Sequence, residues 1–257
     1  MPGARRPARG VSREVVVAGR RAALEAVRAS LATEVLIARG SRTTPGLREV
    51  LEATSGAGVP VREVDPRELD SLAADHHGVV ARVRSPGSIG ERELATTTFA
   101  DDALVVVLDG IEDPQNLGAS ARSAEAAGAA MIVTRTRRAA DVTPAAIQAS
   151  AGALLHLPHA RVANIPRALE RLKDAGFTVV GLDERSPRSV YEAGAVEGRV
   201  AVVLGSEWTG VARLTREACD VLVSLPMRGR VGSLNASASL AAVLYAFVLP
   251  SRRGGQA

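Results

Sequence analysis

The sequence holds a single cysteine, Cys219, which excludes an internal disulfide and a zinc site with several thiolate ligands. We interpret Cys219 as a small, buried apolar side chain. Long apolar runs are also missing, since none approaches the ~20 residues that span a membrane. The basic segment MPGARRPARG is not followed by the apolar stretch of a secretory signal. We therefore predict a cytoplasmic protein.

Aromatic residues make up only 2% of the chain, which argues against a surface built from several base-stacking side chains. Lysine is nearly absent: of the 32 Lys and Arg residues, only Lys173 is a lysine. Arginine binds phosphate through a planar fork of donors. The formal net charge of +4 permits a nucleic-acid partner without requiring one. His156 and His159 have no neighbouring His or thiol cluster in the sequence, so we predict no metal site.

Hydrophobic patterning predicts two folded parts. Residues 1–14 are rich in arginine, proline and glycine, and we expect a disordered basic tail. Residues 15–84 alternate between strand-like and helix-like patterns, which predicts a small α/β domain. Residues 85–100 contain Pro86, Gly87 and Gly90 and are typical of an interdomain linker. A second domain is predicted over residues 101–257.

The second domain alternates continuous apolar segments with helical patterns. Strands are predicted at 104–108, 130–134, 177–182, 200–204 and 221–225, and helices at 117–127, 144–151, 165–175 and 235–248. Continuous apolar strands separated by helices are typical of a mostly parallel sheet that is covered on both faces. The sequence therefore predicts an α/β fold.

Three polar, glycine-containing loops follow apolar strands, at residues 109–116, 205–210 and 226–233. In open parallel sheets, ligands bind beyond the carboxyl ends of the strands. None of the loops has the GxGxxG pattern of a dinucleotide site or the GxxxxGK pattern of a phosphate-binding loop. The loops therefore favour a nucleoside cofactor whose adenine edge is bound by backbone amides and carbonyls.

Five segments carry a resemblance to a known family. Residues 108–129 (LDGIEDPQNLGASARSAEAAGA), 202–227 (VVLGSEWTGVARLTREACDVLVSLPM) and 229–247 (GRVGSLNASASLAAVLYAF) resemble the three motifs of the SpoU/TrmH branch of the SPOUT methyltransferases. Residues 17–29 (VAGRRAALEAVRA) and 74–83 (ADHHGVVARV) are similar to the ribosomal-protein-like substrate domain of rRNA guanosine 2′-O-methyltransferases. That family often has Gln at the position of His77.

The resemblance implies a fold and an activity. The fold would be a SPOUT-type, mostly parallel α/β domain with a C-terminal trefoil knot, preceded by a small α/β RNA-binding domain. The activity would be transfer of a methyl group from S-adenosylmethionine to a ribose 2′-hydroxyl of structured RNA, with a guanosine of large-subunit rRNA as the expected target. The resemblance also implies a homodimer.

The resemblance assigns two sets of site residues. The cofactor's adenosine would be held by Gly181, Leu182, Gly205, Leu225, Pro226, Met227 and Leu234. The catalytic residues would be Asn116, Arg122, Glu207, Ser233 and Asn235. We expect Gly205 where a backbone must approach a ligand closely, with leucines as apolar walls. Glu207 is expected to order the loops by hydrogen bonds to backbone or to Asn235.

Four basic residues of the first domain are predicted RNA contacts. These are Arg20, Arg21, His77 and Arg82, with Arg84 and the basic tail as further phosphate contacts. Contacts of this kind position RNA without reading its sequence.

The catalytic candidates also have plain structural interpretations. Asn116, Ser233 and Asn235 stand where helix-capping residues are expected. Arg122 could pair with Glu125 on an exposed helix face. As a catalytic group Arg122 is a poor base, because a guanidinium has a pKa above ~12. Fixing the target phosphate or stabilising alkoxide charge is physically easier for it, and its role stays open.

Two other functions remain open from the sequence. One is a related 2′-O-methyltransferase that acts on tRNA or confers resistance to a ribosome-directed antibiotic. The other is a non-catalytic RNA-binding factor in ribosome assembly.

Overall fold

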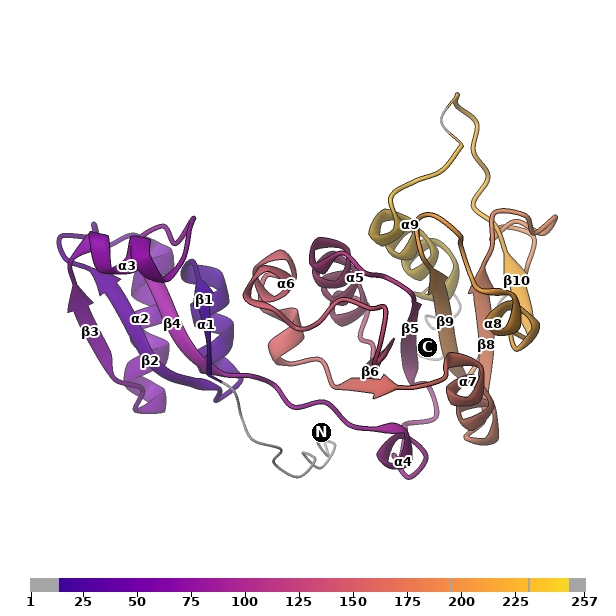
Figure 1. The fold of residues 1–257 in the computed structure, drawn as a ribbon, viewed down its shortest axis with the longest axis horizontal. Helices are drawn as coiled ribbons and strands as arrows, with labels where there is room; N and C mark the ends of the chain where they lie inside the picture. The colour runs from indigo at the N-terminus through magenta and orange to yellow at the C-terminus, as the bar shows by residue number, and fades with distance from the viewer. Residues whose placement is uncertain (1–13, 195, 231, 250–257) are drawn as a thin grey trace, which may run out of the picture. The chain divides into compact units, whose positions relative to one another are not determined.

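A computed structural model describes residues 14–194, 196–230 and 232–249. The predicted tail, except for its last residue, lies outside these ranges. The described chain forms two compact units, one of residues 14–87 with 141–156 and the other of residues 88–140 with 157–249. Figure 1 shows the first unit mainly in indigo to magenta, and the second from magenta to yellow. The domain boundaries drawn from the sequence remain predictions.

The first unit contains a four-stranded sheet with the order β1-β4-β2-β3. Its strands are β1 (Glu14–Ala18), β2 (Ala32–Ala38), β3 (Val61–Val64) and β4 (Val79–Arg84). β4 pairs antiparallel with both β1 and β2, whereas β2 and β3 are parallel. The helices are α1 (Arg20–Arg28), α2 (Pro45–Ala57) and α3 (Pro66–Leu72). Leu69 of α3 is fully buried and packs with Leu36 and Val80 of the sheet.

A later segment of the chain joins this unit. It forms α6 (Pro144–Ala149) and a short 3-10 helix, η1 (Ala153–Leu155). His156 Nε2 lies 2.9 Å from Glu25 Oε2 on α1. Gly152 sits against the same residue so closely that an added Cβ would lie 2.5 Å from the Glu25 Cβ. The sequence pattern predicts residues 141–156 as part of the larger domain.

The second unit is built on a six-stranded sheet in which every pair is parallel. The strand order is β10-β8-β9-β5-β6-β7. The strands are β5 (Leu104–Asp109), β6 (Met131–Arg135), β7 (His159–Val162), β8 (Phe177–Leu182), β9 (Arg199–Gly205) and β10 (Val221–Val223). The predicted α/β fold with a mostly parallel sheet is therefore confirmed.

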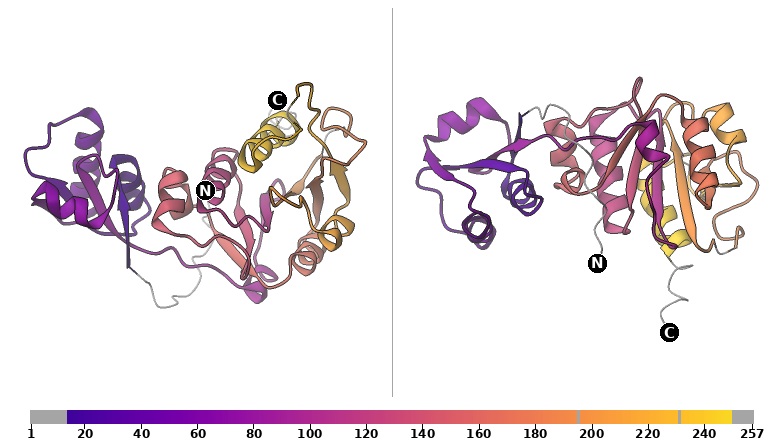
Figure 2. Two further views of the ribbon diagram at one scale, coloured as in Figure 1. Left: turned by 45° about the horizontal axis from the view of Figure 1, so that its top comes forward. Right: turned by 90° about the horizontal axis from the view of Figure 1, so that it is seen from below.

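Helices cover both faces of this sheet. α5 (Pro114–Ala126) and α9 (Ala236–Val243) pack together on one face (Figures 1 and 2). α7 (Ile165–Asp174) covers the other face, with α8 (Arg213–Glu217) and α4 (Glu91–Leu94) beside it. Val105 and Val107 of β5 point to the α7 side, where they share a core with Leu169. Strand alternation thus gives each helix layer its own apolar surface.

Two stretches differ from their predicted form. The expected linker contains α4, because Glu93 accepts a hydrogen bond from the Gly90 N–H at 2.7 Å and Leu94 is buried. The helix expected over 235–248 is α9 followed by a π-helical turn, η2 (Leu244–Val248). Residue 235 lies outside α9 because its side chain caps the helix.

The core predicts a contrast between two leucines. Leu169 of α7 is fully buried, whereas Leu214 of α8 is 56% exposed. Leu169→Ala should lower the free energy of unfolding by about 2–5 kcal/mol, because it removes buried methyl groups and leaves a cavity. Leu214→Ala should change it by less than about 0.5 kcal/mol. Urea denaturation measures both, and equal losses would contradict this packing.

Candidate functional site

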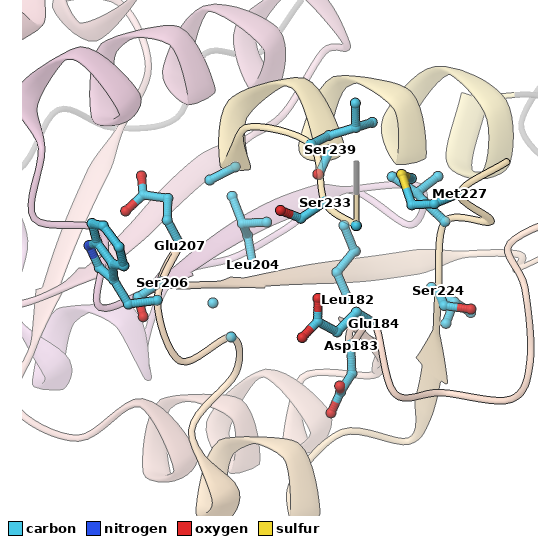
Figure 3. A pocket seen from close by; sticks show the side chains of 18 residues that line it. Leu182, Asp183, Glu184, Leu204, Ser206, Glu207, Ser224, Met227, Ser233 and Ser239 are labelled. Atoms are coloured by element: carbon cyan, nitrogen blue, oxygen red, sulfur yellow. The ribbon is translucent and has the colours of Figure 1, made fainter. Parts of the chain in front are cut away.

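A cleft opens at the carboxyl ends of β8, β9 and β10 and beside the start of α9 (Figure 3). Its cavity volume is about 140 Å³, so it is a shallow cleft that stays open to solvent. Many lining residues were predicted for the cofactor or for catalysis: Leu182, Gly205, Glu207, Leu225, Met227, Ser233 and Leu234. Gly181, Pro226, Asn116, Arg122 and Asn235 were predicted as well but do not line it. The lining thus comes from the loops after β8, β9 and β10.

Two glycines near the cleft are required by the chain's own packing. A Cβ on Gly205 would lie 2.0 Å from the backbone carbon of Gly210. A Cβ on Gly181 would lie 2.7 Å from Cys219 Sγ and 2.8 Å from Leu222 Cδ2. The close approach expected at Gly205 is therefore made by the loop after β9. This contact exists without a ligand.

A chain of side-chain hydrogen bonds joins three of the predicted catalytic residues. Asn116 Nδ2 donates to Glu207 Oε1, and Asn235 Nδ2 donates to Asn116 Oδ1 at 2.9 Å. Glu207 was expected to bond to backbone or to Asn235, and the structure places Asn116 between the two. The bonds tie the loop after β9 to α5 and to the start of α9. They fix one edge of the cleft.

Helix capping explains why these asparagines are available. Asp113, not Asn116, caps α5 by accepting the Gln115 N–H at 3.0 Å. Asn116 lies in the first turn with its side-chain amide free to bond elsewhere. Asn235 caps α9, since its Oδ1 accepts the Ser237 N–H at 3.0 Å. Its Nδ2 remains for Asn116, so Asn235 serves both helix and site.

Asp183 is a cleft residue that sequence reasoning missed. Its side chain is 3% exposed and accepts hydrogen bonds from the Nε of Arg185 at 3.0 Å and the Nη1 of Arg216 at 3.3 Å. Burial disfavours its ionised form, but the hydrogen bonds outweigh burial and lower the pKa of Asp183 below its ordinary value. Asp183 thereby fastens the loop after β8 to α8. Its position directly after the apolar run 177–182 was the only available signal.

Other lining residues were also missed. Glu184, Ser206, Trp208, Ser224 and Ser239 line the cleft next to predicted positions. Neighbourhood in the sequence could have suggested them, but not which way their side chains point.

Arg122 lies on α5, six residues after Asn116. At a helical rise of about 1.5 Å per residue, the two are separated by about 9 Å along the axis. Arg122 is exposed, and among the described residues it forms neither the ion pair with Glu125 that the spacing allowed nor any other. The structure therefore does not bring Arg122 into the cleft of its own chain.

The predicted RNA contacts fall into two groups. Arg20, Arg21 and His77 line one cavity of the first unit. Arg82 instead pairs with Glu34, with its Nε 3.2 Å from Oε2. Arg84 donates to the Ser30 carbonyl at 3.1 Å. The first three are therefore less constrained by protein partners than the last two.

Other chemistry is sparse in the described part of the chain. It contains no cluster of three or more His, Cys, Asp or Glu residues that could hold a metal ion. Within the same ranges, no helix has the length and apolar character needed to cross a membrane. Burial raises the pKa of the Cys219 thiol to about 12, and its Sγ donates to the Thr215 carbonyl at 3.2 Å. Cys219 therefore stays protonated and structural.

The Asp183 cluster predicts a pH-dependent stability difference. Because its folded pKa is lowered, ionised Asp183 stabilises the fold above the unfolded pKa of about 4, and this is lost as pH falls through the folded pKa. Asp183→Asn should therefore cost about 1–3 kcal/mol at pH 7, and the difference from wild type should shrink below about pH 4. Chemical denaturation across pH measures it. A difference unchanged from pH 7 to pH 3 would contradict the assignment.

Comparisons with known proteins agree with this geometry. Residues 103–245 match the model of the SpoU rRNA Methylase family, and residues 16–88 match a model described as RNA 2′-O ribose methyltransferase substrate binding. The 23S rRNA (guanosine-2′-O-)-methyltransferase RlmB of Photobacterium profundum is 35% identical over 86% of this chain and 94% of its own length. An uncharacterized tRNA/rRNA methyltransferase of Mycolicibacterium vanbaalenii is 39% identical over 89% of this chain and 74% of its own.

A solved structure shows the same fold. The SpoU methyltransferase AviRb of Streptomyces viridochromogenes, in complex with the cofactor AdoMet, superposes with a TM-score of 0.75 at 28% identity, covering 95% of this chain and 91% of its own. The family model covers more than half of this sequence, and the motif residues it spans form the cleft described above. The chain belongs to the SpoU rRNA methylase family.

Proposed function

We propose that this protein transfers a methyl group from S-adenosylmethionine to a ribose 2′-hydroxyl of structured RNA, with a guanosine of large-subunit rRNA as target. Membership of the SpoU family supports the reaction type. The RlmB relatives, named for guanosine 2′-O-methylation in 23S rRNA, support the target. The AdoMet complex of AviRb supports the cofactor.

The electrostatic character of the cleft carries the proposal. Its described lining includes the carboxylates of Glu184 and Glu207 but no arginine, lysine or histidine, and its third carboxylate, Asp183, is already paired with Arg185 and Arg216. Such a site disfavours phosphate and suits a ligand with a positive charge. Leu182, Leu225 and Leu234 add apolar walls for a planar base. S-adenosylmethionine combines a sulfonium cation with a nucleoside that has no phosphate, so the residues fit it.

The chain's own residues position the reactants. When bound, the cofactor supplies a methyl group that its sulfonium makes electrophilic. Glu207, Asn116 and Asn235 hold the edge of the cleft where the ribose enters. A fixed geometry of this kind supplies much of a rate enhancement by orientation. Although Arg122 lies outside the cleft of its own chain, we assign it to the target phosphate or to the alkoxide charge that develops on the ribose oxygen.

A homodimer is part of the proposal. α9 and its π-helical turn expose Ala238, Ala246 and Tyr245, the last 52% exposed. Ala126 of α5 is exposed as well. Small side chains allow helices to approach closely, and an exposed tyrosine suits an interface.

We also propose a trefoil knot, RNA binding by the first domain and a cytoplasmic location. The trefoil knot is supported by the strand order, because the chain passes beyond β8 to form β10 and then returns to pack α9 against β9 and α5. RNA binding by the first domain, with Arg20, Arg21 and His77 as contacts, is supported by their common cavity and the substrate-binding match. A cytoplasmic location accords with an rRNA substrate.

Arg122→Ala should lower kcat for methyl transfer about 10²–10³-fold or more, because it removes a group that stabilises charge in the transition state. Incorporation of labelled methyl from S-adenosylmethionine into deproteinised rRNA measures it. The matched control is Arg213→Ala on α8, which removes an exposed arginine paired with Glu217 at 2.7 Å and should keep the wild-type rate. A wild-type rate in Arg122→Ala would exclude the catalytic role.

The same assay separates the alternatives. Labelled tRNA with unlabelled rRNA would select a tRNA methyltransferase. Absence of S-adenosylmethionine binding by calorimetry would select a non-catalytic RNA-binding factor.

A further inference from the structure

The single tryptophan stands apart from most of the other aromatic residues. Phe99, Phe177 and Phe247 are buried in the second unit, whereas Trp208 is 93% exposed. An aromatic side chain in a core buries about 150–250 Å². Trp208 forgoes this burial in the turn that follows β9. Because it also lines the cleft, its ring is available to stack on a ligand there.

Trp208 is held in a tight turn at the edge of the cleft. Ser206 and Gly210 exchange two backbone hydrogen bonds, at 3.1 and 2.9 Å. Ser206 Oγ also lies 2.7 Å from Thr209 Oγ1 and accepts the Thr209 N–H at 3.2 Å. The adjacent Glu207 is bonded to Asn116. The backbone that presents the indole is thus fixed on both sides before any ligand binds.

We propose that Trp208 stacks on the base of the target nucleotide and so helps to position the ribose. This inference rests on the proposed function. Consecutive Cα atoms are about 3.8 Å apart, so the Cα of Trp208 lies about that far from the Cα of Glu207, whose carboxylate bonds to Asn116. When the target ribose lies at that edge of the cleft, the base attached to it lies close to Trp208. RNA recognition commonly uses unstacked bases laid on aromatic side chains.

The layout of the cleft favours the target base over the cofactor's adenine. Figure 3 shows Glu207 and Met227 on opposite sides of the cleft. Met227, one of the proposed adenosine residues, lies on the side away from Glu207, whereas Gly205 is the last residue of β9 before the turn that carries Glu207 and Trp208. Trp208 follows Glu207 directly and lines the cleft with it. The surrounding Ser206, Glu207 and Thr209 are polar, which suits a nucleotide better than a broad apolar protein interface.

Kinetics test this role. Trp208→Ala should lower kcat/KM for rRNA about 5- to 100-fold, as loss of one stacking aromatic does, mainly through KM. W208F should recover most of the loss, because phenylalanine keeps a π-face. Affinity for S-adenosylmethionine, measured by calorimetry, should be unchanged in both. Tyr191→Ala removes a 72% exposed aromatic that does not line the cleft and serves as the control with wild-type kinetics.

Fluorescence tests it independently, because all tryptophan emission comes from Trp208. Deproteinised large-subunit rRNA should quench the emission, with W208F as the blank, while S-adenosylhomocysteine alone and protein dilution should not change it. Quenching by S-adenosylhomocysteine would assign the indole to the cofactor. A spectrum that shifts with protein concentration would assign it to a second copy. Either result, or wild-type kcat/KM in W208A, would overturn the stacking role.

The two proposals fail separately. If the wild-type protein binds S-adenosylmethionine and methylates rRNA but W208A does so equally well, only the stacking role is lost. If the wild-type protein transfers no methyl group to RNA, the proposed function itself is lost.

Discussion

The hydrogen-bonded chain Glu207–Asn116–Asn235 is the constraint on which the site depends. It joins segments that lie far apart in the sequence, since Asn116 and Glu207 are 91 residues apart and Asn116 and Asn235 are 119 apart. Asn116 is suited to the middle position because an amide side chain both donates and accepts. An aspartate there would place a second carboxylate beside Glu207. These hydrogen bonds form only when the sheet, α5 and α9 are all folded in their places.

The parallel sheet makes that arrangement possible. Its strands β5, β9, β8 and β10 end at one edge, so loops from distant parts of the sequence meet there. Asp109 at the end of β5 pairs with Arg135 of β6 at 2.7 Å and accepts the Ala212 N–H at 3.3 Å. Gly205 and Gly210 let the loop after β9 fold tightly on itself. The cleft differs in charge from the rest of the molecule: its described lining carries carboxylates, although the whole sequence has a net charge of +4.

Sequence reasoning could predict the parallel α/β architecture, because apolar strands such as 104–108 and 200–204 are unambiguous. It missed β7, whose four residues begin with the polar His159 and include Arg161. The family resemblance identified Leu182, Gly205, Glu207 and Leu225 at the cleft. It could not reveal that Gly205 faces the chain's own backbone, or that Asp113 rather than Asn116 caps α5. Asp183 and Trp208 were missed because a sequence gives residue types, whereas burial and orientation arise only when the loops meet.

The cleft between the loops after β8, β9 and β10 is the proposed binding site of S-adenosylmethionine. A crystal structure of this protein with S-adenosylmethionine bound tests it most directly. We expect density for the adenosine between Leu182, Gly205 and the segment 225–227, with the methyl group directed towards the edge held by Asn116 and Glu207. Density for the cofactor at another place in the molecule, with this cleft vacant, would contradict the account.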